Sequence, residues 1–274
     1  MNCDVSRALG VKKTTHFDFG GNWKSFSDSA LTSERVAQAR TDFYELMRGA
    51  ILPDRTFLDV GFGQGLAICL AKEARAEVYG NDINPKCVEA LNSTARFFPG
   101  VDLTSIPIVV GSILDDVVLQ RLGQLQRGGF DIVYSWGVLH HTGAMDEAIR
   151  RTASLVKPGG SFVLAIYNTH WSSPVWGLIK RMYNRAPSLV RRILVALFLP
   201  LIFAAKFVVT RRNPLKMERG MSFYHDVVDW IGGYPYEHRT KHEVRALLES
   251  LGFRLERSIP ATVPTGCNQF VFRR

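Results

Sequence analysis

The chain has 274 residues, an apolar fraction of 46% and a formal net charge of +9. This is enough chain for one large α/β domain, or for one domain with a substantial insertion, and the composition is that of a globular protein with a sizeable core. No internal repeat or low-complexity tract is present, and no N-terminal run has the pattern of a signal peptide.

The four cysteines argue against two kinds of site. They lie far apart in the sequence and form no C-x-x-C pair, which disfavours zinc and a disulfide framework. No metal site is predicted. We therefore expect reduced thiols in a cytoplasmic protein. The cysteines are Cys3, Cys69, Cys87 and Cys267.

The positive charge is concentrated in one segment. Residues 169–220 carry ten Lys or Arg side chains and a single acid, Glu218, so the remainder of the chain is close to neutral. A local excess of charge needs a local explanation, and it does not describe the protein as a whole.

The first clear periodicity predicts an amphipathic helix over residues 33–49, with Val36, Phe43, Leu46 and Met47 on one face. Predicted strands and helices then alternate, which is typical of a parallel sheet with helices on both faces. Strands are expected at residues 57–60, 77–80, 106–110, 130–134 and 161–167, and helices at residues 66–71 and 145–156.

The alternation stops after Asn168 and resumes with a helix over residues 241–251. Two strands, at residues 253–259 and 268–272, complete the chain. The simplest interpretation is one Rossmann-like domain over residues 33–274 that carries an insertion after the fifth strand.

The insertion spans residues 169–239, and residues 1–32 lie outside the alternation. We expect those first residues to form an N-terminal arm that packs on the domain. The insertion is expected to be a helical lid or a membrane-contacting segment, because it is both basic and apolar.

A glycine-rich loop, Asp59-Val-Gly61-Phe-Gly63-Gln-Gly65, follows the first predicted strand. Glycines at such a turn let the backbone approach a ligand closely. The dinucleotide fingerprint needs a glycine at the position of Leu66, so a nicotinamide-dependent oxidoreductase is disfavoured. The Asp59 carboxylate favours a cationic ligand over a pyrophosphate, and S-adenosylmethionine carries a sulfonium and an ammonium.

A second carboxylate, Asp82, ends the second predicted strand. An acid at this position of a Rossmann-like sheet accepts hydrogen bonds from ribose hydroxyls. The alternative is that Asn81-Asp82 only begins a turn. The strand order and the spacing favour the ribose role.

Four motifs together resemble the successive motifs of class I S-adenosylmethionine-dependent methyltransferases, and they occur in the expected order over residues 55–168. The similarity is greatest to quinone-biosynthesis-like and small-molecule methyltransferases. It implies a Rossmann-like, seven-stranded mixed sheet with the last strand antiparallel, and S-adenosyl-L-methionine as cofactor. The motifs are Asp59–Gly65, Asp82, Phe130–His141 and Val156–Gly160.

The resemblance also implies residue roles. The loop glycines would line the methionine moiety, Asp82 would hold the ribose, and Ser112 and Ile113 would lie against adenine. Many relatives have an acid where Ser112 stands, and Asp115 is the alternative adenine contact. Residues 134–138 would border the methyl group. The predicted cofactor-binding residues are Trp23, Asp59, Gly61, Gly63, Gly65, Asp82, Ile83, Ser112, Ile113 and Trp136.

The stretch from Phe17 to Phe26 also resembles an arm found in a poorly characterised branch of this class. The resemblance implies that the arm folds over the cofactor, and Trp23 is its candidate contact. The alternative is that the aromatic residues of the stretch only anchor the arm to the core.

Two groups of residues are candidates for catalysis. A general base is needed only where the acceptor must lose a proton, and histidine titrates in the right range. His140 and His141 follow the fourth predicted strand, at the edge where such folds bind ligands. His225 and Asp226 belong to an aromatic and acidic stretch near the end of the insertion that suggests a substrate-facing wall. The alternatives are a structural histidine and a capping helix whose aromatic residues fill the core.

The apolar part of the insertion favours contact with a membrane surface through residues 187–212. Its run at residues 193–205 has 13 uncharged residues, followed by Lys206. A spanning helix needs ~20 apolar residues, so we expect this run, which contains Pro200, not to span. Flanking arginines and aromatic residues suit an interfacial segment at the inner face of a membrane. A lid or a homodimer contact is the alternative, and nucleic acid is least favoured because no base-stacking element is evident.

The sequence therefore predicts an S-adenosylmethionine-dependent methyltransferase that acts on a small-molecule or lipid-like acceptor, most often on oxygen, by in-line transfer. The competing function is a catalytically inactive peripheral membrane or scaffold protein that keeps the fold. An RNA methyltransferase is less favoured, because Ser135-Trp-Gly-Val138 stands where base-modifying amino-methyltransferases carry an N-P-P-Y type tetrad.

Overall fold

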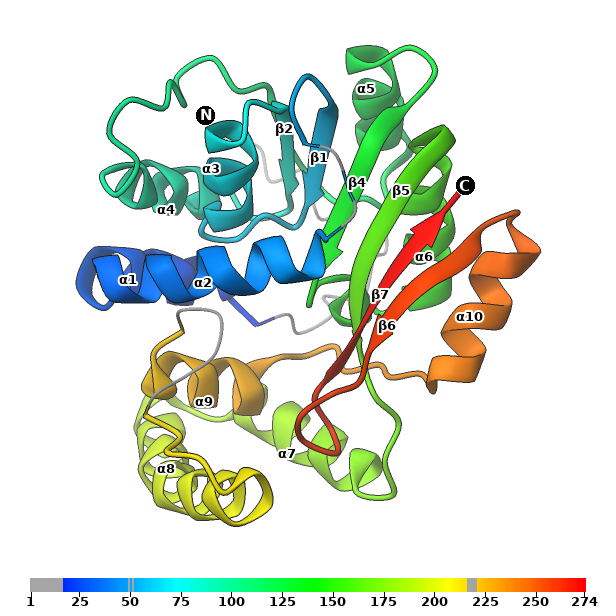
Figure 1. Cartoon of the computed structure of the whole chain (residues 1–274). Helices are drawn as coiled ribbons and strands as arrows, with labels where there is room; N and C mark the ends of the chain where they lie inside the picture. The colour runs from blue at the N-terminus through cyan, green and yellow to red at the C-terminus, as the bar shows by residue number, and fades with distance from the viewer. Residues whose placement is uncertain (1–16, 49, 51, 216–220) are drawn as a thin grey trace, which may run out of the picture.

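The structure, a computed structural model, describes residues 17–48, 50, 52–215 and 221–274. Its centre is a seven-stranded sheet in the order β3-β2-β1-β4-β5-β7-β6 (Figure 1). The strands are β1 (Thr56–Val60), β2 (Glu77–Asp82), β3 (Ile108–Val110), β4 (Phe130–Trp136), β5 (Val156–Tyr167), β6 (Arg254–Ile259) and β7 (Cys267–Arg273).

Only β7 runs against its neighbours. Strands β1 to β5 pair in parallel, and β7 pairs antiparallel with both β5 and β6. The expected mixed sheet with an antiparallel last strand is confirmed. The strand order reverses between β1 and β4, and ligands bind at such a switch point, outside the carboxyl ends of the strands.

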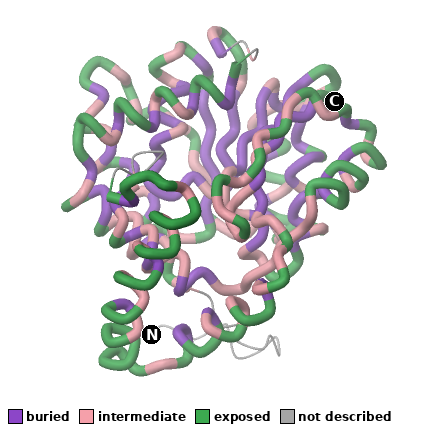
Figure 2. The backbone as a smooth tube through the Cα atoms, turned by 60° about the horizontal axis from the view of Figure 1, so that its bottom comes forward, coloured by how far each residue is buried: buried purple, intermediate pink, exposed green. Residues whose placement is uncertain are grey.

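Helices cover both faces, so the central strands are buried while the helices expose their outer sides (Figure 2). Hydrophobic core forms on each face of the sheet. One face is covered by α2 (Ser33–Leu46), α3 (Leu66–Glu73) and α4 (Lys86–Ala95), and the other by α5 (Asp116–Leu125), α6 (Met145–Ser154) and α10 (Lys241–Ser250).

Polar side chains fix where several helices begin. Thr32 accepts a hydrogen bond from the Arg35 amide at the start of α2, and Asp115 accepts one from the Val117 amide at the start of α5. Thr240 and Glu243 form a reciprocal capping box at the start of α10. Such caps satisfy amides that have no partner inside the helix.

The N-terminal arm and the start of the fifth strand differ from the pattern-based expectation. Residues 19–29, expected within an arm, form helix α1 (Phe19–Ser29), which begins where Asp18 caps the Gly21 amide. Strand β5 begins at Val156, ahead of the expected breaker Lys157-Pro-Gly-Gly160. The pairing with β4 shifts register there, so the proline and glycines form an irregularity inside the strand.

The insertion forms three helices below the carboxyl ends of the parallel strands (Figure 1). They are α7 (Ser173–Arg185), α8 (Ser188–Thr210) and α9 (Phe223–Gly232). A small core of Tyr183, Val195, Ile202, Val227 and Ile231 holds them together. Helix α8 has 23 residues, longer than the apolar run alone indicated, because Lys206 is accommodated by an ion pair with Asp226.

Candidate functional site

The loop between β1 and α3 requires glycine for two reasons. Gly61, Gly63 and Gly65 have φ values of +77°, +56° and +74°, a region that favours glycine. A Cβ atom at Gly61 would also lie 2.3 Å from Val138 Cγ1, and one at Gly65 would lie 2.3 Å from Leu91 Cδ1. The loop therefore runs against its surroundings with no room for side chains.

Helix α1 crosses this loop. A Cβ atom at Gly63 would lie 3.0 Å from Trp23 Nε1, so the indole of Trp23 lies directly beside the glycine backbone. Phe26 of the same helix is fully buried in the core, which anchors α1 to the domain. The anchoring role considered for the aromatic residues of this stretch thus has a structural counterpart, whereas contact of Trp23 with the cofactor stays a prediction.

Asp82 links the loop to the end of β2. Its Oδ2 atom accepts a hydrogen bond from the Gly63 amide at 3.0 Å, and its Oδ1 atom accepts one from the Asn84 amide at 2.9 Å. Burial raises the pKa of Asp82, while these amide donors act in the opposite direction. The carboxyl group is thus held at the carboxyl edge of the sheet, beside the loop.

The residues expected near adenine have different environments. Ile83 is 63% exposed beside Asp82 and offers apolar surface to a flat ring. Ile113 is buried in the core on the α5 side of the sheet. The Ser112 hydroxyl accepts a hydrogen bond from the Leu114 amide, and Asp115 caps α5. Both polar groups therefore already accept hydrogen bonds from nearby backbone amides.

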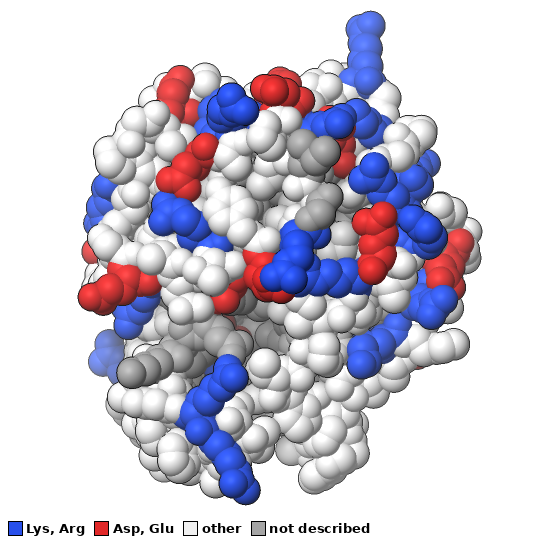
Figure 3. All heavy atoms as spheres, in the orientation of Figure 1, with Lys and Arg blue, Asp and Glu red and all other residues white. Residues whose placement is uncertain are grey.

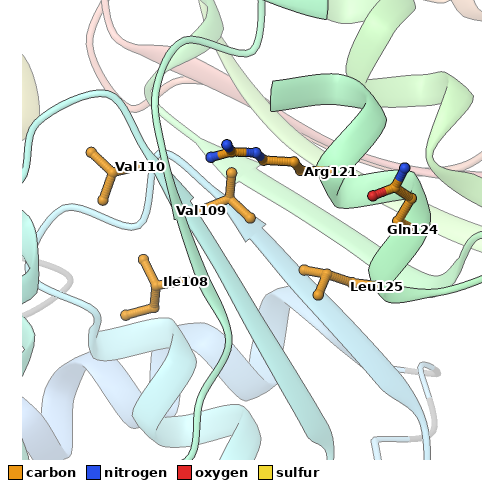
Figure 4. A pocket seen from close by; sticks show the side chains of 6 residues that line it. All are labelled: Ile108, Val109, Val110, Arg121, Gln124 and Leu125. Atoms are coloured by element: carbon orange, nitrogen blue, oxygen red, sulfur yellow. The ribbon is translucent and has the colours of Figure 1, made fainter. Parts of the chain in front are cut away.

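A shallow hollow nearby contains none of the predicted cofactor residues. It lies between edge strand β3 and helix α5, and Arg121 and Leu125 reach from the helix toward the strand (Figure 4). Its position on the outer edge of the sheet separates it from the glycine loop. Its lining residues are Ile108, Val109, Val110, Arg121, Gln124 and Leu125.

The remaining predicted cofactor residues lie at the ends of β1 and β4. Asp59 is buried in β1, and Trp136 ends β4, where its Nε1 donates to Gln269 Oε1 at 3.1 Å. Within the described part of the chain, the buried Gln64 Oε1 atom has no hydrogen-bond partner. A buried acceptor without a donor is costly, and the ammonium group of S-adenosylmethionine could supply that donor.

These features fit S-adenosylmethionine. The glycine loop adopts a tight left-handed turn without side chains, Asp82 supplies a carboxylate for hydroxyl donors, and Gln64 supplies an acceptor inside the loop. All three lie at the carboxyl ends of β1 and β2, next to the switch point of the sheet.

His140 and His141 form a short helical turn just after β4. The Nδ1 atom of His141 lies 2.7 Å from the Pro235 carbonyl oxygen, so Nδ1 carries the hydrogen and donates it. In neutral His141 the Nε2 atom is then the acceptor. The ring lies 4.7 Å from that of Phe19, which brings α1 next to it.

His140 is fully buried and has a different environment. Its Nδ1 accepts a hydrogen bond from the Tyr167 amide at 3.4 Å, and the two rings lie 3.9 Å apart. Burial lowers its pKa well below the usual histidine value, and His141 and Lys180 add to the effect. This histidine is therefore neutral at physiological pH.

His225 and Asp226 point to different neighbours. The Nδ1 of His225 lies 2.7 Å from the Ser222 hydroxyl, and its ring packs on Phe26, so it faces α1. Asp226 instead forms an ion pair with Lys206 of α8. The structure therefore does not bring these two side chains together as an acid–base pair.

A buried lysine lies between the sheet and the insertion. The sequence pattern had indicated it only as one of the basic residues of the insertion. Lys180 of α7 is fully buried and donates to the Trp230 carbonyl oxygen. Its Nζ lies 4.2 Å from the Trp230 ring centroid and 4.8 Å from that of Tyr236, a cation–π cage. Tyr167 closes the cage at 5.6 Å.

The carboxyl group of Asp229 in α9 interacts electrostatically with the Lys180 amine. Burial raises the pKa of Asp229 to about 8 and lowers that of Lys180 to about 7, and each charge favours the charged form of the other. The Asn22 side chain donates to Asp229 Oδ1 at 2.6 Å. One sequence signal existed, because Lys180 shares a helical face with the buried Ser173, Tyr183 and Asn184.

Comparison with known proteins agrees with this site. A family model described as "Methyltransferase domain" matches residues 32–257. A ubiquinone biosynthesis O-methyltransferase from Ralstonia nicotianae is 29% identical over 111 residues, which cover 40% of this chain and 42% of that protein. One from Bordetella avium is 27% identical over 149 residues, covering 53% and 55%. The chain thus spans about half the length of the curated relatives it matches.

Solved structures share the fold. Magnesium protoporphyrin IX methyltransferase from Synechocystis with bound S-adenosylhomocysteine has a TM-score of 0.54 at 17% identity and covers 93% of both chains. An O-methyltransferase family protein from Burkholderia thailandensis has a TM-score of 0.52 at 14% identity, covering 92% of this chain and 59% of that one. The family match spans most of this chain, which therefore belongs to the methyltransferase domain family.

Proposed function

We propose that this enzyme methylates an oxygen atom of a small, lipid-like acceptor and that His141 takes the proton of the acceptor hydroxyl. The observation that carries the proposal is the hydrogen bond from His141 Nδ1 to the Pro235 carbonyl, which places the proton on Nδ1 and makes Nε2 the basic nitrogen of the neutral ring, in the turn after β4. A base in this position suits a hydroxyl acceptor, which must lose its proton.

The cofactor, when bound, supplies an electrophilic methyl group. The chain contributes orientation and proton transfer. His141 would accept the proton that the acceptor hydroxyl loses on methylation. Much of the acceleration comes from holding the acceptor in line, and α1 and α9 exclude water from that space.

Two observations support oxygen and an apolar acceptor. The matched curated relatives are named O-methyltransferases of ubiquinone biosynthesis. Aromatic rings of Tyr167, Trp230 and Tyr236 gather around Lys180, between the end of β5 and the insertion. Aromatic rings of this kind bury large apolar area and favour a flat or hydrocarbon-rich substrate.

The direct test is His141→Ala, assayed with radiolabelled methyl donor and an extract of the source organism. We expect label transfer to fall by about 10²–10⁴-fold while S-adenosylhomocysteine binding is retained. The lost activity should partly return at high pH, where hydroxide ionises the acceptor. The matched control is His242→Ala on the exposed side of α10, which should transfer label like the wild type. Full activity in His141→Ala would remove the proposed proton acceptor.

A further inference from the structure

Helix α8 presents a long apolar surface to solvent. Val190, Ile193, Leu197, Leu201 and Val208 recur every three, four or seven positions and therefore share one face. Leu197 is 63% exposed and Leu201 is 60% exposed, although large hydrophobic residues are usually covered. The exposed hydrophobic residues of α7 and α8 are Val175, Leu178, Met182, Leu189, Val190, Ile193, Leu197, Leu201, Phe207, Val208 and Val209.

The opposite face of α8 is fastened to the domain. Val195 and Ile202, about two turns apart, pack in the small core with Val227 and Ile231 of α9. Lys206 of α8 forms its ion pair with Asp226 of α9. Residues Ser188–Thr210 form a helix long and apolar enough to cross a membrane. Its attachment to α9 along one side instead favours an orientation along the membrane surface.

The charges around this surface are of one sign. Arginines stand at both ends of the helix, at positions 191–192 and 211–212, and no acidic residue occurs from 169 to 217. Figure 3 shows the same pattern, because the lower face over α7 and α8 is mostly uncharged, with Lys and Arg side chains but hardly any Asp or Glu. Apolar residues bordered by arginines complement an anionic lipid surface.

We infer that α8 rests in the headgroup region of an anionic bilayer, with its axis parallel to the membrane and its Leu197–Leu201 face in the lipid. The insertion lies at the carboxyl ends of the strands, so the site would open near the bilayer (Figure 1). The inference deepens the proposed function, since a bilayer would be the source of a lipid-like acceptor. Its test is independent of turnover.

The test is co-sedimentation of the full chain with vesicles of phosphatidylcholine, with and without phosphatidylglycerol. We expect binding to the phosphatidylglycerol vesicles that weakens at high salt, because exposed charges are screened. The double variant Leu197→Asp/Leu201→Asp should lower the partition coefficient by about tenfold or more, because it removes two leucine side chains that the lipid would otherwise bury. Arg192→Gln/Arg211→Gln should reduce only the phosphatidylglycerol-dependent part.

The matched control is Val117→Asp, at an exposed apolar position on α5. It should bind vesicles like the wild type, and all variants should keep S-adenosylhomocysteine binding. If wild-type protein does not co-sediment with phosphatidylglycerol vesicles, the inference is overturned. So does a dimer in light scattering that dissociates in Leu197→Asp/Leu201→Asp, because a second copy would then cover the face. Vesicle binding without methyl transfer would instead count against the proposed function alone.

Discussion

Asn22 of α1 donates its side-chain amide to Asp229 of α9 at 2.6 Å, and a second hydrogen bond joins the same amide to the His225 carbonyl oxygen. The two residues are 207 positions apart in the sequence. The contact joins the helix that covers the glycine loop to the insertion that covers the carboxyl edge. Helices α1 and α9, which are distant in the sequence, are therefore joined to each other where they cover the site.

Replacing Asn22 tests that link. Asn22→Ala leaves the buried Asp229 carboxyl without its donor, which costs about 1–3 kcal/mol of stability. We expect a lower midpoint in urea unfolding and weaker S-adenosylhomocysteine binding, because Trp23 is next to Asn22. Lys24→Ala, on the exposed side of α1, is the control and should change neither quantity appreciably. Equal behaviour of the two variants would show that the contact is dispensable.

The Asp229 carboxyl makes stability depend on pH. Its pKa is raised to about 8 by burial, so the folded protein binds a proton that the unfolded chain releases near pH ~4. This contribution to stability is present at low pH and is lost as pH rises toward 8. The variant Asp229→Asn removes the charge, so its melting temperature should rise relative to the wild type between pH 5 and pH 8. A difference that is constant over this range would contradict the assignment.

The contribution of Lys180 to the pH dependence of stability has the opposite sign to that of Asp229. Its pKa is lowered to about 7, so its contribution is present at high pH and is lost as pH falls through about 7. Lys180→Met, which keeps an unbranched side chain of nearly the same length without the charge, should flatten the pH dependence of the melting temperature between pH 7 and pH 10. An unchanged slope in this range would place the titration elsewhere.

Asp82 should control cofactor affinity. Asp82→Asn keeps the shape of the side chain but loses the charge that accepts hydroxyl donors, and we expect S-adenosylhomocysteine binding to weaken by about tenfold or more in calorimetry. Asp116→Asn, at an exposed position of α5, is the matched control. Unchanged affinity in Asp82→Asn would refute the ribose assignment.

The glycine loop can be tested by adding one methyl group. Gly61→Ala forces a side chain into a left-handed conformation, which costs about 1–2 kcal/mol, and places it against Val138. We expect lower stability and weaker cofactor binding, partly restored by the additional change Val138→Ala. Gly123→Ala, in an exposed helical position with open space, should stabilise the protein instead. Stability gains in both alanine variants would contradict the observed loop geometry.

The sheet and the cofactor loop were predictable because they depend on local patterns. Buried strands read as short apolar runs, and Gly61 to Gly65 mark a turn that only glycine allows. Strand β5 was misjudged at its start, because pairing with β4 tolerates Pro158 and the following glycines at an irregularity. Tertiary pairing overrides the local breaker signal there.

The contacts between the insertion and the sheet were not predictable in the same way. Lys180 is buried by α9 and by the end of β5, and nothing within its own helix shows that an aromatic cage will surround it. His225 and Asp226 are adjacent in sequence, yet consecutive helical positions point in different directions, toward α1 and toward α8. Such contacts arise only when the insertion folds over the sheet.

The most direct test of the whole account is the fate of a labelled methyl group. Purified protein is incubated with radiolabelled methyl donor and an extract of the source organism, and the products are then separated into organic and aqueous phases. We expect label in the organic phase, bound through an ether or ester oxygen. Label confined to the aqueous phase, or attached to nitrogen or carbon, would contradict a lipid-like oxygen acceptor.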